Sequence, residues 1–330
     1  NSTIKQNEVF GNQKHGLDIS GRWLNVSQNL IYSNGDGIEE YGVNFDTIDY
    51  STFNNNTVKD QRYGIFIGGF SNDFIIKYNQ FNNCREFGFK LEGSDPIRRI
   101  SAHHNNMTHG GIQINMPLAN YENVEDYSID ETNLLDGKPI YVFYNQSFLD
   151  QDNFTNAGQI LLLYCENSTI NGQEITNAGH GLYLRGCLNI SIEANNFSNN
   201  VWGIYSLSDN LTIRRNNFTA NQYGIEITDY RHNHSIINNK FVKSIKSGIV
   251  MEDCYDNNLS QNRFLNSGIY FSVRGEIYVN HIDTSNTVNG KPIYYFNNLE
   301  GLDPRNYMNA GQVILRNCNR SLIRDINVSS

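Results

Sequence analysis

The chain is organised around a glycine that is followed by an aliphatic or aromatic residue and recurs at a nearly constant spacing. The spacings are 21, 27, 24 and 23 residues in the first part of the chain and 22, 21, 24 and 20 in the second. These glycines are Gly16, Gly37, Gly64, Gly88, Gly111, Gly181, Gly203, Gly224, Gly248 and Gly268. Helix-pair repeats need about 33 residues or more, so a period of about 22 predicts one turn of a β-solenoid.

Between the glycines, apolar residues occupy every second position over short stretches, as in 210–218 and 221–227. This alternation is typical of short strands with one buried face. Asn and Gly separate the strands, and both residue types tolerate the positive φ that tight corners require. The pattern therefore predicts an all-β solenoid of about 14 coils.

The sequence also contains a second repeat that is much longer than one coil. Residues 129–141 return as residues 282–294, at an offset of 153. The match continues at the same offset without a gap, through Cys165 and Cys318. We therefore expect one continuous solenoid over residues 1–330, with an internal duplication that gives two seven-coil units at 23–175 and 176–328.

Two features resemble a known family. The coil pattern resembles the pectin-lyase-like right-handed β-helices, and the Asp/Asn-Gly-Lys-Pro-Ile-Tyr segments at 136–141 and 289–294 resemble a module of NosD-like proteins, including many archaeal secreted surface proteins. The resemblance covers essentially the whole chain and implies a single-domain right-handed parallel β-helix. That superfamily includes lyases, hydrolases, epimerases, adhesins, sheath-like structural proteins and a copper-maturation factor, so the fold alone does not imply one function.

The charge excludes some partners. A formal net charge of −9 and the lack of a basic stripe argue against nucleic acid or an anionic membrane surface as partners. The apolar runs are short, so we expect no membrane span. The chain begins at Asn1 without a leader pattern, which we interpret as a mature or excised piece of a secreted protein at the cell surface.

N-x-S/T sequons recur along the chain and indicate N-glycosylation, although an Asn-, Ser- and Thr-rich solenoid also produces sequons by chance. The candidate sites are Asn25, Asn55, Asn106, Asn145, Asn153, Asn167, Asn189, Asn196, Asn210, Asn217, Asn233 and Asn258.

No catalytic constellation emerges from the sequence. Gly179-His180-Gly181 matches a short motif of the polygalacturonase hydrolases, but no cluster of Asp residues accompanies it. A Ca²⁺-dependent lyase would need acidic residues beside an Arg or Lys. The acidic candidates are Asp36, Glu39, Glu40, Asp46 and Asp49. No Arg or Lys lies between Arg22 and Lys59, so we interpret these residues as a solvated acidic patch. We assign no catalytic residue.

The resemblance to NosD directs attention to copper ligands, which are soft or imidazole groups. His103 and His104 with Met107 and His109 form one candidate group, and His232 with His234 forms another. Both groups lie in corner segments where exposed polar residues are common. We therefore expect no metal and no cofactor.

Cys165 and Cys187 lie at the same place in consecutive coils, each five residues before an Ile. Stacked coils are about 4.8 Å apart, close to the Cα separation of a disulfide. The pair can form a bridge, or it can be part of a ladder of small buried side chains. Aromatic residues are also plentiful, and they can form core ladders or line a carbohydrate groove. Two such groups are Tyr141, Phe143 and Tyr144, and Tyr294, Tyr295 and Phe296.

The two ends of the sequence show no capping helix, so we expect that either neighbouring segments of a longer polypeptide or other subunits cover the end strands. From the second possibility we expect self-association through the solenoid ends or edges, as a structural building block of a sheath, filament or surface layer. A carbohydrate-binding or polysaccharide-modifying protein, with cell-surface glycans as partners, is the alternative from another class. A NosD-like factor of copper-enzyme maturation is a third.

Overall fold

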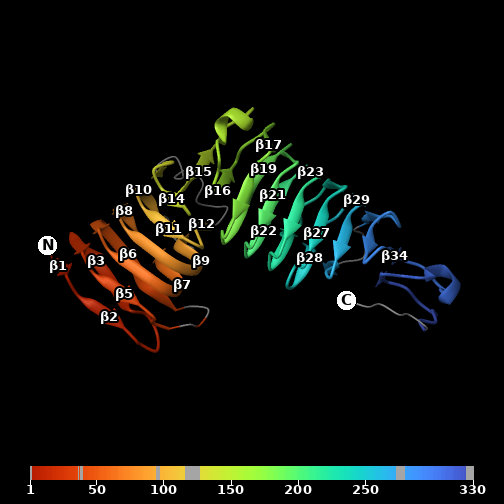
Figure 1. Cartoon of the computed structure of the whole chain (residues 1–330), viewed down its shortest axis with the longest axis horizontal. Helices are drawn as coiled ribbons and strands as arrows, with labels where there is room; N and C mark the ends of the chain where they lie inside the picture. Colours follow the sequence, from red (N-terminus) through yellow and green to blue (C-terminus); the bar gives the residue numbers. More distant parts are fainter. Residues whose placement is uncertain are drawn as a thin grey trace. The chain divides into compact units, whose positions relative to one another are not determined.

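The computed structural model describes residues 2–35, 37, 40–93, 97–115, 127–272 and 279–324. The chain is an all-β solenoid of about 13 turns, and strands of successive coils pair in parallel (Figure 1). This confirms the predicted fold class. The coils are about one fewer than expected because 134–144 and 287–297 fold into antiparallel hairpins, which use residues without adding a coil.

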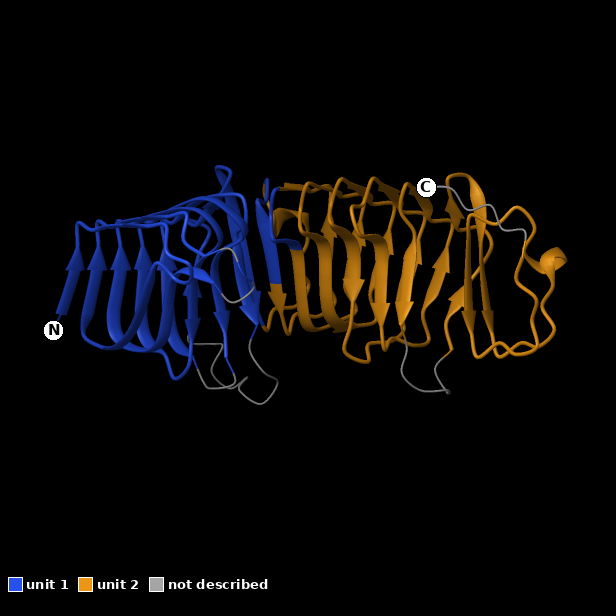
Figure 2. Cartoon of the chain, turned by 90° about the horizontal axis from the view of Figure 1, so that it is seen from below, with its two compact units in different colours: residues 1–144, 156–161, 177–181 blue, residues 145–155, 162–176, 182–330 orange. Residues whose placement is uncertain are grey.

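The strands belong to two compact units (Figure 2). Unit 1 comprises residues 1–144, 156–161 and 177–181, and unit 2 comprises residues 145–155, 162–176 and 182–330. The predicted seven-coil units at 23–175 and 176–328 follow the sequence repeat instead, and they stay a prediction.

Unit 1 contains three rows of parallel strands. The first row contains β1 (Ser2–Lys5), β4 (Leu24–Ser27), β6 (Tyr41–Asn54), β8 (Asn72–Lys77), β10 (Arg98–His103) and β13 (Ser128–Ile129). The second row contains β2 (Glu8–Phe10), β5 (Leu30–Tyr32), β7 (Thr57–Gly68), β9 (Gln80–Glu92), β11 (Asn106–Thr108) and β14 (Leu134–Leu135). The third row contains β3 (Leu17–Arg22), parts of β6, β7 and β9, and β12 (Ile112–Asn115). The hairpin strand β15 (Lys138–Tyr144) pairs with β14.

Unit 2 repeats this plan with shorter strands. Its first row contains β17 (Thr169–Asn171), β20 (Ser191–Glu193), β23 (Thr212–Arg214), β26 (Ser235–Ile237), β29 (Asn258–Ser260) and β32 (His281–Ile282). Its second row contains β18 (Glu174–Thr176), β21 (Asn196–Ser198), β24 (Asn217–Thr219), β27 (Lys240–Val242), β30 (Arg263–Leu265) and β33 (Thr287–Val288). Its third row contains β22 (Trp202–Asp209), β25 (Tyr223–Ile227), β28 (Ser247–Glu252) and β31 (Ile269–Ser272).

Strand β19 (His180–Leu188) pairs with β22 and so precedes it in the third row of unit 2. Both β19 and β16 (Gln159–Leu163) contain residues of both units. Two short 3₁₀ helices are η2 (Gln151–Asn153) and η3 (Pro304–Tyr307), and the aspartate that precedes each one, Asp150 or Asp303, caps it. Strands β34 (Lys291–Asn297) and β35 (Gln312–Arg316) pair in parallel in unit 2. Within the described residues, no helix is long and apolar enough to span a membrane.

The core consists of columns in which one inward side chain stacks on the next. The rings of Phe197, Phe218, Phe241 and Phe264 stack along unit 2 with successive centroid distances of 5.2, 4.7 and 4.7 Å. All four side chains are fully buried, and burying each contributes roughly 1.5–3 kcal/mol. The predicted alternation of buried and outward residues is thus what holds successive coils together.

Buried asparagines form a second kind of column at one corner of each coil. In unit 2 this ladder contains Asn195, Asn216, Asn239, Asn262 and Asn286. In each step the Oδ1 of one asparagine accepts a hydrogen bond from the backbone N–H of the asparagine one coil earlier, at 2.9–3.1 Å. A matching ladder in unit 1 contains Asn29, Asn56, Asn79, Asn105 and Asn133. The ladders satisfy backbone groups that the corners would otherwise leave unpaired.

The coil glycines are required by close packing between coils. A Cβ atom on Gly64 would lie 2.2 Å from the carbonyl oxygen of Gly88, closer than side chains allow. One predicted member of this series is wrong. The register Leu17↔Val43 places Gly42, rather than Gly37, in the column between Gly16 and Gly64.

The 153-residue offset is also visible in the secondary structure. Strands β14, β15 and β16 begin 153 residues before β33, β34 and β35. The Oε1 of Gln159 accepts a hydrogen bond from the backbone of Ile112 at 2.8 Å, and the Oε1 of Gln312 does the same for Ile269 at 3.0 Å. The internal duplication itself stays an inference from the sequence.

Candidate functional site

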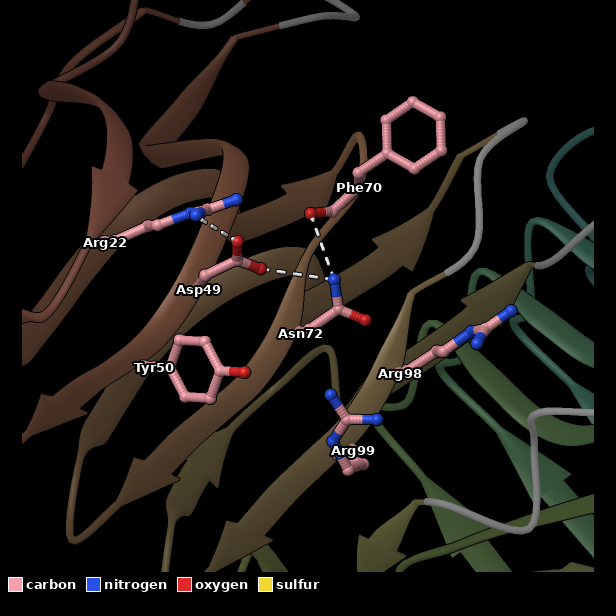
Figure 3. Close-up of a pocket in the computed structure, with 7 residues that line it drawn as sticks. All are labelled: Arg22, Asp49, Tyr50, Phe70, Asn72, Arg98 and Arg99. Carbon is pink, nitrogen blue, oxygen red and sulfur yellow. Dashed lines mark hydrogen bonds and ion pairs between the residues drawn. The ribbon is translucent and has the colours of Figure 1, made fainter.

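An open cavity of about 380 Å³ lies on the surface of unit 1 (Figure 3). It extends over four successive coils, at the corner where the chain passes from the third row of strands to the first row. Its lining residues are Arg22, Asp49, Tyr50, Phe70, Asn72, Arg98 and Arg99. They come from β3, β6, the β7–β8 turn, β8 and β10. A second cavity, of about 450 Å³, lies in unit 2 beside Asn298, Glu300, Asn317 and Asn319, and these four lining residues include neither a ring nor a cation.

One side of the first cavity is a column of polar side chains, one from each coil. Arg22, Asp49, Asn72 and Arg98 are direct register partners on β3, β6, β8 and β10. The Nε of Arg22 lies 2.9 Å from the Oδ2 of Asp49, and the Nδ2 of Asn72 donates to the Oδ1 of Asp49 at 3.1 Å. The solenoid therefore assembles residues that are 23–27 positions apart in sequence.

The next corner position forms a neighbouring column. It contains Trp23, Tyr50, Asp73 and Arg99, which all have left-handed backbone with φ of 46–61°. The rings of Trp23 and Tyr50 stack at 4.5 Å and 11°, although 55% and 48% of these residues remain exposed. Asp73 and Arg99 form two hydrogen bonds of 2.7 and 2.8 Å, which lower the pKa of Asp73. Tyr50 and Phe70, which is 55% exposed, line the cavity and give it apolar rings, and Trp23 extends this apolar surface beyond Tyr50.

The cavity combines cations, hydrogen-bonding groups and exposed rings. Such a combination can hold a sugar, because ring faces pack on its C–H groups while amides, carboxylates and guanidinium groups bond its hydroxyls. Among the described lining residues the one carboxylate is Asp49, and it is held by Arg22 and Asn72. Acid–base cleavage of a glycosidic bond generally needs two carboxyl groups.

The predicted acidic patch is partly wrong. Asp36 and Glu39 lie outside the described residues, and Glu40 accepts a hydrogen bond from the backbone of Gly37. Asp49 is not solvated among other acids, because the coil register places Arg22 beside it. The cation that pairs with Asp49 is distant in sequence because it lies one coil away, and only the coil spacing indicates that the two residues meet.

His180 is a core residue. It is buried, its ring packs 4.9 Å from that of Phe87, and burial lowers its pKa to about 3. A Cβ atom on Gly179 would lie 2.1 Å from the carbonyl oxygen of Glu86, so this glycine serves close packing.

The candidate copper ligands do not converge. The two ring nitrogens of His103 face Asp130 and Ser101, each at 2.7 Å, while Met107 is fully buried. His104 stacks on Tyr78 at 5.0 Å. His109 is exposed at a left-handed corner.

The second histidine pair is also divided between two environments. His232 stacks on Tyr255 at 4.9 Å and its Nδ1 lies 3.1 Å from Asp209, whereas His234 is buried and accepts a hydrogen bond from Leu211. Over the described part of the chain, no three His, Cys, Asp or Glu side chains are grouped as metal ligands.

Cys165 and Cys187 lie on consecutive coils, as the register Ile170↔Ile192 shows. Both are buried thiols in this structure, and a hydrogen bond from the Cys187 thiol lowers the pKa of Cys165. Burial raises the pKa of Cys187. The bridge stays a prediction for oxidising conditions.

The remaining candidates lie on the surface or are half-buried. Of the twelve sequon asparagines, nine are exposed and three, Asn106, Asn210 and Asn217, are half-buried. Glycosylation itself stays a prediction. The two aromatic groups are half-buried, and Tyr141 stacks on Phe143 at 6.2 Å as Tyr294 does on Phe296 at 6.0 Å.

Solved structures with a similar fold include several β-helix proteins. The catalytic unit of a GH87 α-1,3-glucanase from Streptomyces thermodiastaticus is 10% identical, with a TM-score of 0.37, over 86% of this chain and 63% of that one. The tailspike of E. coli bacteriophage HK620, in complex with a pentasaccharide, is 13% identical, with a TM-score of 0.37, over 97% and 55%. A single-substitution mutant of the periplasmic alginate epimerase AlgG is 12% identical, with a TM-score of 0.35, over 97% and 76%. This chain thus spans less than two thirds of the glucanase and the tailspike, and these similarities concern the fold.

Sequence comparison gives the family. No curated protein matches the chain. The model of the right-handed β-helix region matches residues 1–121, in agreement with the parallel coils. A second family model covers residues 105–303, more than half of the chain, and includes both hairpin segments whose sequence resembles NosD. The chain therefore belongs to the NosD family, which is described as periplasmic copper-binding protein (NosD).

Proposed function

We propose that this protein is a carbohydrate-binding β-solenoid that holds a glycan on the outer face of unit 1. The observation that carries the proposal is the exposed ring stack of Trp23 and Tyr50 at the edge of a polar cavity. Exposed rings cost solvation free energy unless a ligand covers them, and a pyranose has an apolar face that suits them. Because the two columns run from coil to coil, an extended chain of sugars would meet one residue of each column at each step, with the rings at one end and the paired charges of Asp73 and Arg99 at the other.

The proposed site of action is outside the cytoplasm, at the cell surface or in a secreted form. The family is described as periplasmic. The exposed sequons support the same location, since N-linked glycans are added to surface segments of exported chains.

Removing the rings tests the proposal. Trp23→Ala and Tyr50→Ala should weaken binding at least fivefold in affinity electrophoresis against a set of neutral and acidic polysaccharides. Phe10→Ala is the matched control, because Phe10 also stacks on a tyrosine, Tyr32, at 5.1 Å and is 56% exposed, but neither ring of that stack lines the cavity, whereas Tyr50 does. Equal retardation of all three variants and the unaltered protein would contradict the proposal.

A structural role in a sheath, filament or surface layer is the second candidate. Unit 2 exposes large apolar side chains at Phe148, Ile245 and Met308, by 77%, 72% and 67%, and such residues favour association with another protein surface. Sedimentation velocity over a hundredfold concentration range tests this role. Growing polymers that shrink on Phe148→Ser would support it, whereas a monomer at every concentration would oppose it.

The family description implies copper, but the residues do not fit a copper site. In the described ranges the best candidate, His103, has both ring nitrogens directed at protein oxygens, and its neighbour Met107 is enclosed in the core. Copper affinity needs several soft or imidazole ligands that point at one position. We therefore assign no role in copper-enzyme maturation to these residues.

A further inference from the structure

Arg98 differs from the other two arginines of the cavity. Arg22 is paired with Asp49, and Arg99 is paired with Asp73. The Nε of Arg98, in contrast, is buried and has no hydrogen-bond partner within the part of the chain that the structure describes. In Figure 3 the dashed contacts join Arg22 to Asp49 and Asn72 to both Asp49 and Phe70, and none reaches Arg98.

A buried donor without a partner is destabilising, and it is more so when the donor carries a charge. The cost persists here because the backbone holds Arg98 in place. Its N–H donates to the carbonyl oxygen of Ser71 at 2.9 Å, and its register partner on β8 is Asn72. The backbone therefore fixes the point from which the Arg98 side chain extends along the cavity.

A guanidinium group suits a planar or tetrahedral anion, because its N–H groups bond two oxygens side by side. Neutral hydroxyl groups would leave part of this capacity unused. The surroundings also suit a sugar that carries such an anion, since Tyr50 and Phe70 offer rings on the same cavity.

We propose that the glycan held by unit 1 is anionic and that its carboxylate or sulfate group binds Arg98. The inference rests on the proposed function, because it names the charge of the ligand at the same site. The overall charge of −9 makes this selectivity informative, since the whole protein would repel a polyanion and only a local site can attract one.

Matched polymers separate the two proposals. Isothermal titration calorimetry should compare polygalacturonate with its fully methyl-esterified form, and dextran sulfate with dextran, at 50 and 500 mM NaCl. We expect one charged polymer to bind at least tenfold more tightly than its neutral partner at low salt, and to lose most of this advantage at high salt. The pair that shows the difference identifies the anion as carboxylate or sulfate.

Arg98→Gln should reduce the affinity for the charged polymer at least tenfold and that for the neutral polymer by a much smaller factor, because Arg98 also lines the cavity that holds the neutral sugar. Arg98→Lys, which keeps the charge but not the planar fork, should be intermediate. Arg263→Gln is the control, because Arg263 is an exposed arginine of unit 2 and the variant has the same net charge as Arg98→Gln. Circular dichroism would verify that each variant is folded.

The possible failures are distinct. Equal binding of charged and neutral polymers, lost in Trp23→Ala, would overturn the anion inference and leave the proposed function in place. Charge-selective binding that persists in Arg98→Gln would also overturn the assignment to Arg98. No binding of any of the four polymers would overturn the proposed function and the inference with it.

Discussion

The asparagine ladder of unit 2 predicts a large cost for removing one amide from its middle. The Oδ1 of Asn216 accepts hydrogen bonds from the backbone N–H and the Nδ2 of Asn195, at 2.9 and 3.0 Å. Its Nδ2 donates to the carbonyl oxygen of Ile192 at 2.8 Å and to the Oδ1 of Asn239 at 3.0 Å. Substitution by alanine removes all four bonds inside the protein.

The size of the destabilisation depends on which hydrogen-bond partners of Asn216 keep another partner after the substitution. The Nδ2 of Asn195 keeps a second acceptor, the carbonyl oxygen of Ile170, and the Oδ1 of Asn239 keeps the backbone N–H of residue 216. The backbone N–H of Asn195 loses its acceptor, whereas the carbonyl oxygen of Ile192 loses one donor but stays in the parallel ladder between β20 and β23. At about 1–3 kcal/mol for the one buried group left without a partner, Asn216→Ala should lower the free energy of unfolding by about 1–3 kcal/mol.

Urea unfolding followed by circular dichroism measures this cost, and Asn217→Ala is the control. Asn217 is the next residue, is only half-buried, and makes one weak side-chain bond, to Thr219 at 3.4 Å. Its substitution should change the free energy of unfolding by less than about 0.5 kcal/mol. Both variants should be produced in a bacterial host, where the sequon at Asn217 is not modified.

Hydrogen exchange adds a local readout, because each coil of a solenoid interacts mainly with its neighbours. The amide of Asn195 should exchange faster in Asn216→Ala, while the amides of unit 1 keep their rates. If the midpoint and slope of the urea unfolding curve of Asn216→Ala equal those of the unaltered protein, the reasoning that the ladder stabilises the coils is refuted.

Three further predictions concern unit 2. Burial lowers the pKa of His234 to about 3, below the value of about 6.5 in an unfolded chain, so its contribution to stability falls by about 1 kcal/mol per pH unit as pH drops from 6.5 towards 3. His234 precedes Asn257 and Asn280 in a column of stacked side chains, so His234→Asn should extend that column with a third amide. The variant should lose this pH dependence and have a higher melting temperature at pH 5, and an unchanged dependence of stability on pH would contradict this. Mild oxidation should join Cys165 to Cys187, detected by peptide mass spectrometry, and stabilise the fold by about 3 kcal/mol for a loop of this length; other pairings would contradict it. Gly224→Ala should lower the unfolding midpoint markedly, because the new Cβ would lie 2.4 Å from a carbonyl oxygen of the next coil; an unchanged midpoint would refute the packing argument.

The sequence by itself determined the fold, because a solenoid is specified locally. Each coil repeats the same alternation, and its glycine and asparagine corners recur about every 22 residues, so the parallel stacking could be inferred without knowing any distant contact. The two neighbouring cysteines could be placed on consecutive coils for the same reason. Even the ladder residues lie at positions that recur with this period.

Only the tertiary structure decided which side chains meet on the surface. Coil lengths vary, so a shift of a few residues changes the register. The register places Gly42 instead of Gly37 in the glycine column, and it places Arg22 beside Asp49, 27 positions away in sequence. The unpaired Nε of Arg98 could not be predicted either, because whether a donor is satisfied depends on the exact neighbours that folding supplies. Local periodicity fixes the path of the chain, whereas the chemistry of the site depends on register, which no single coil contains.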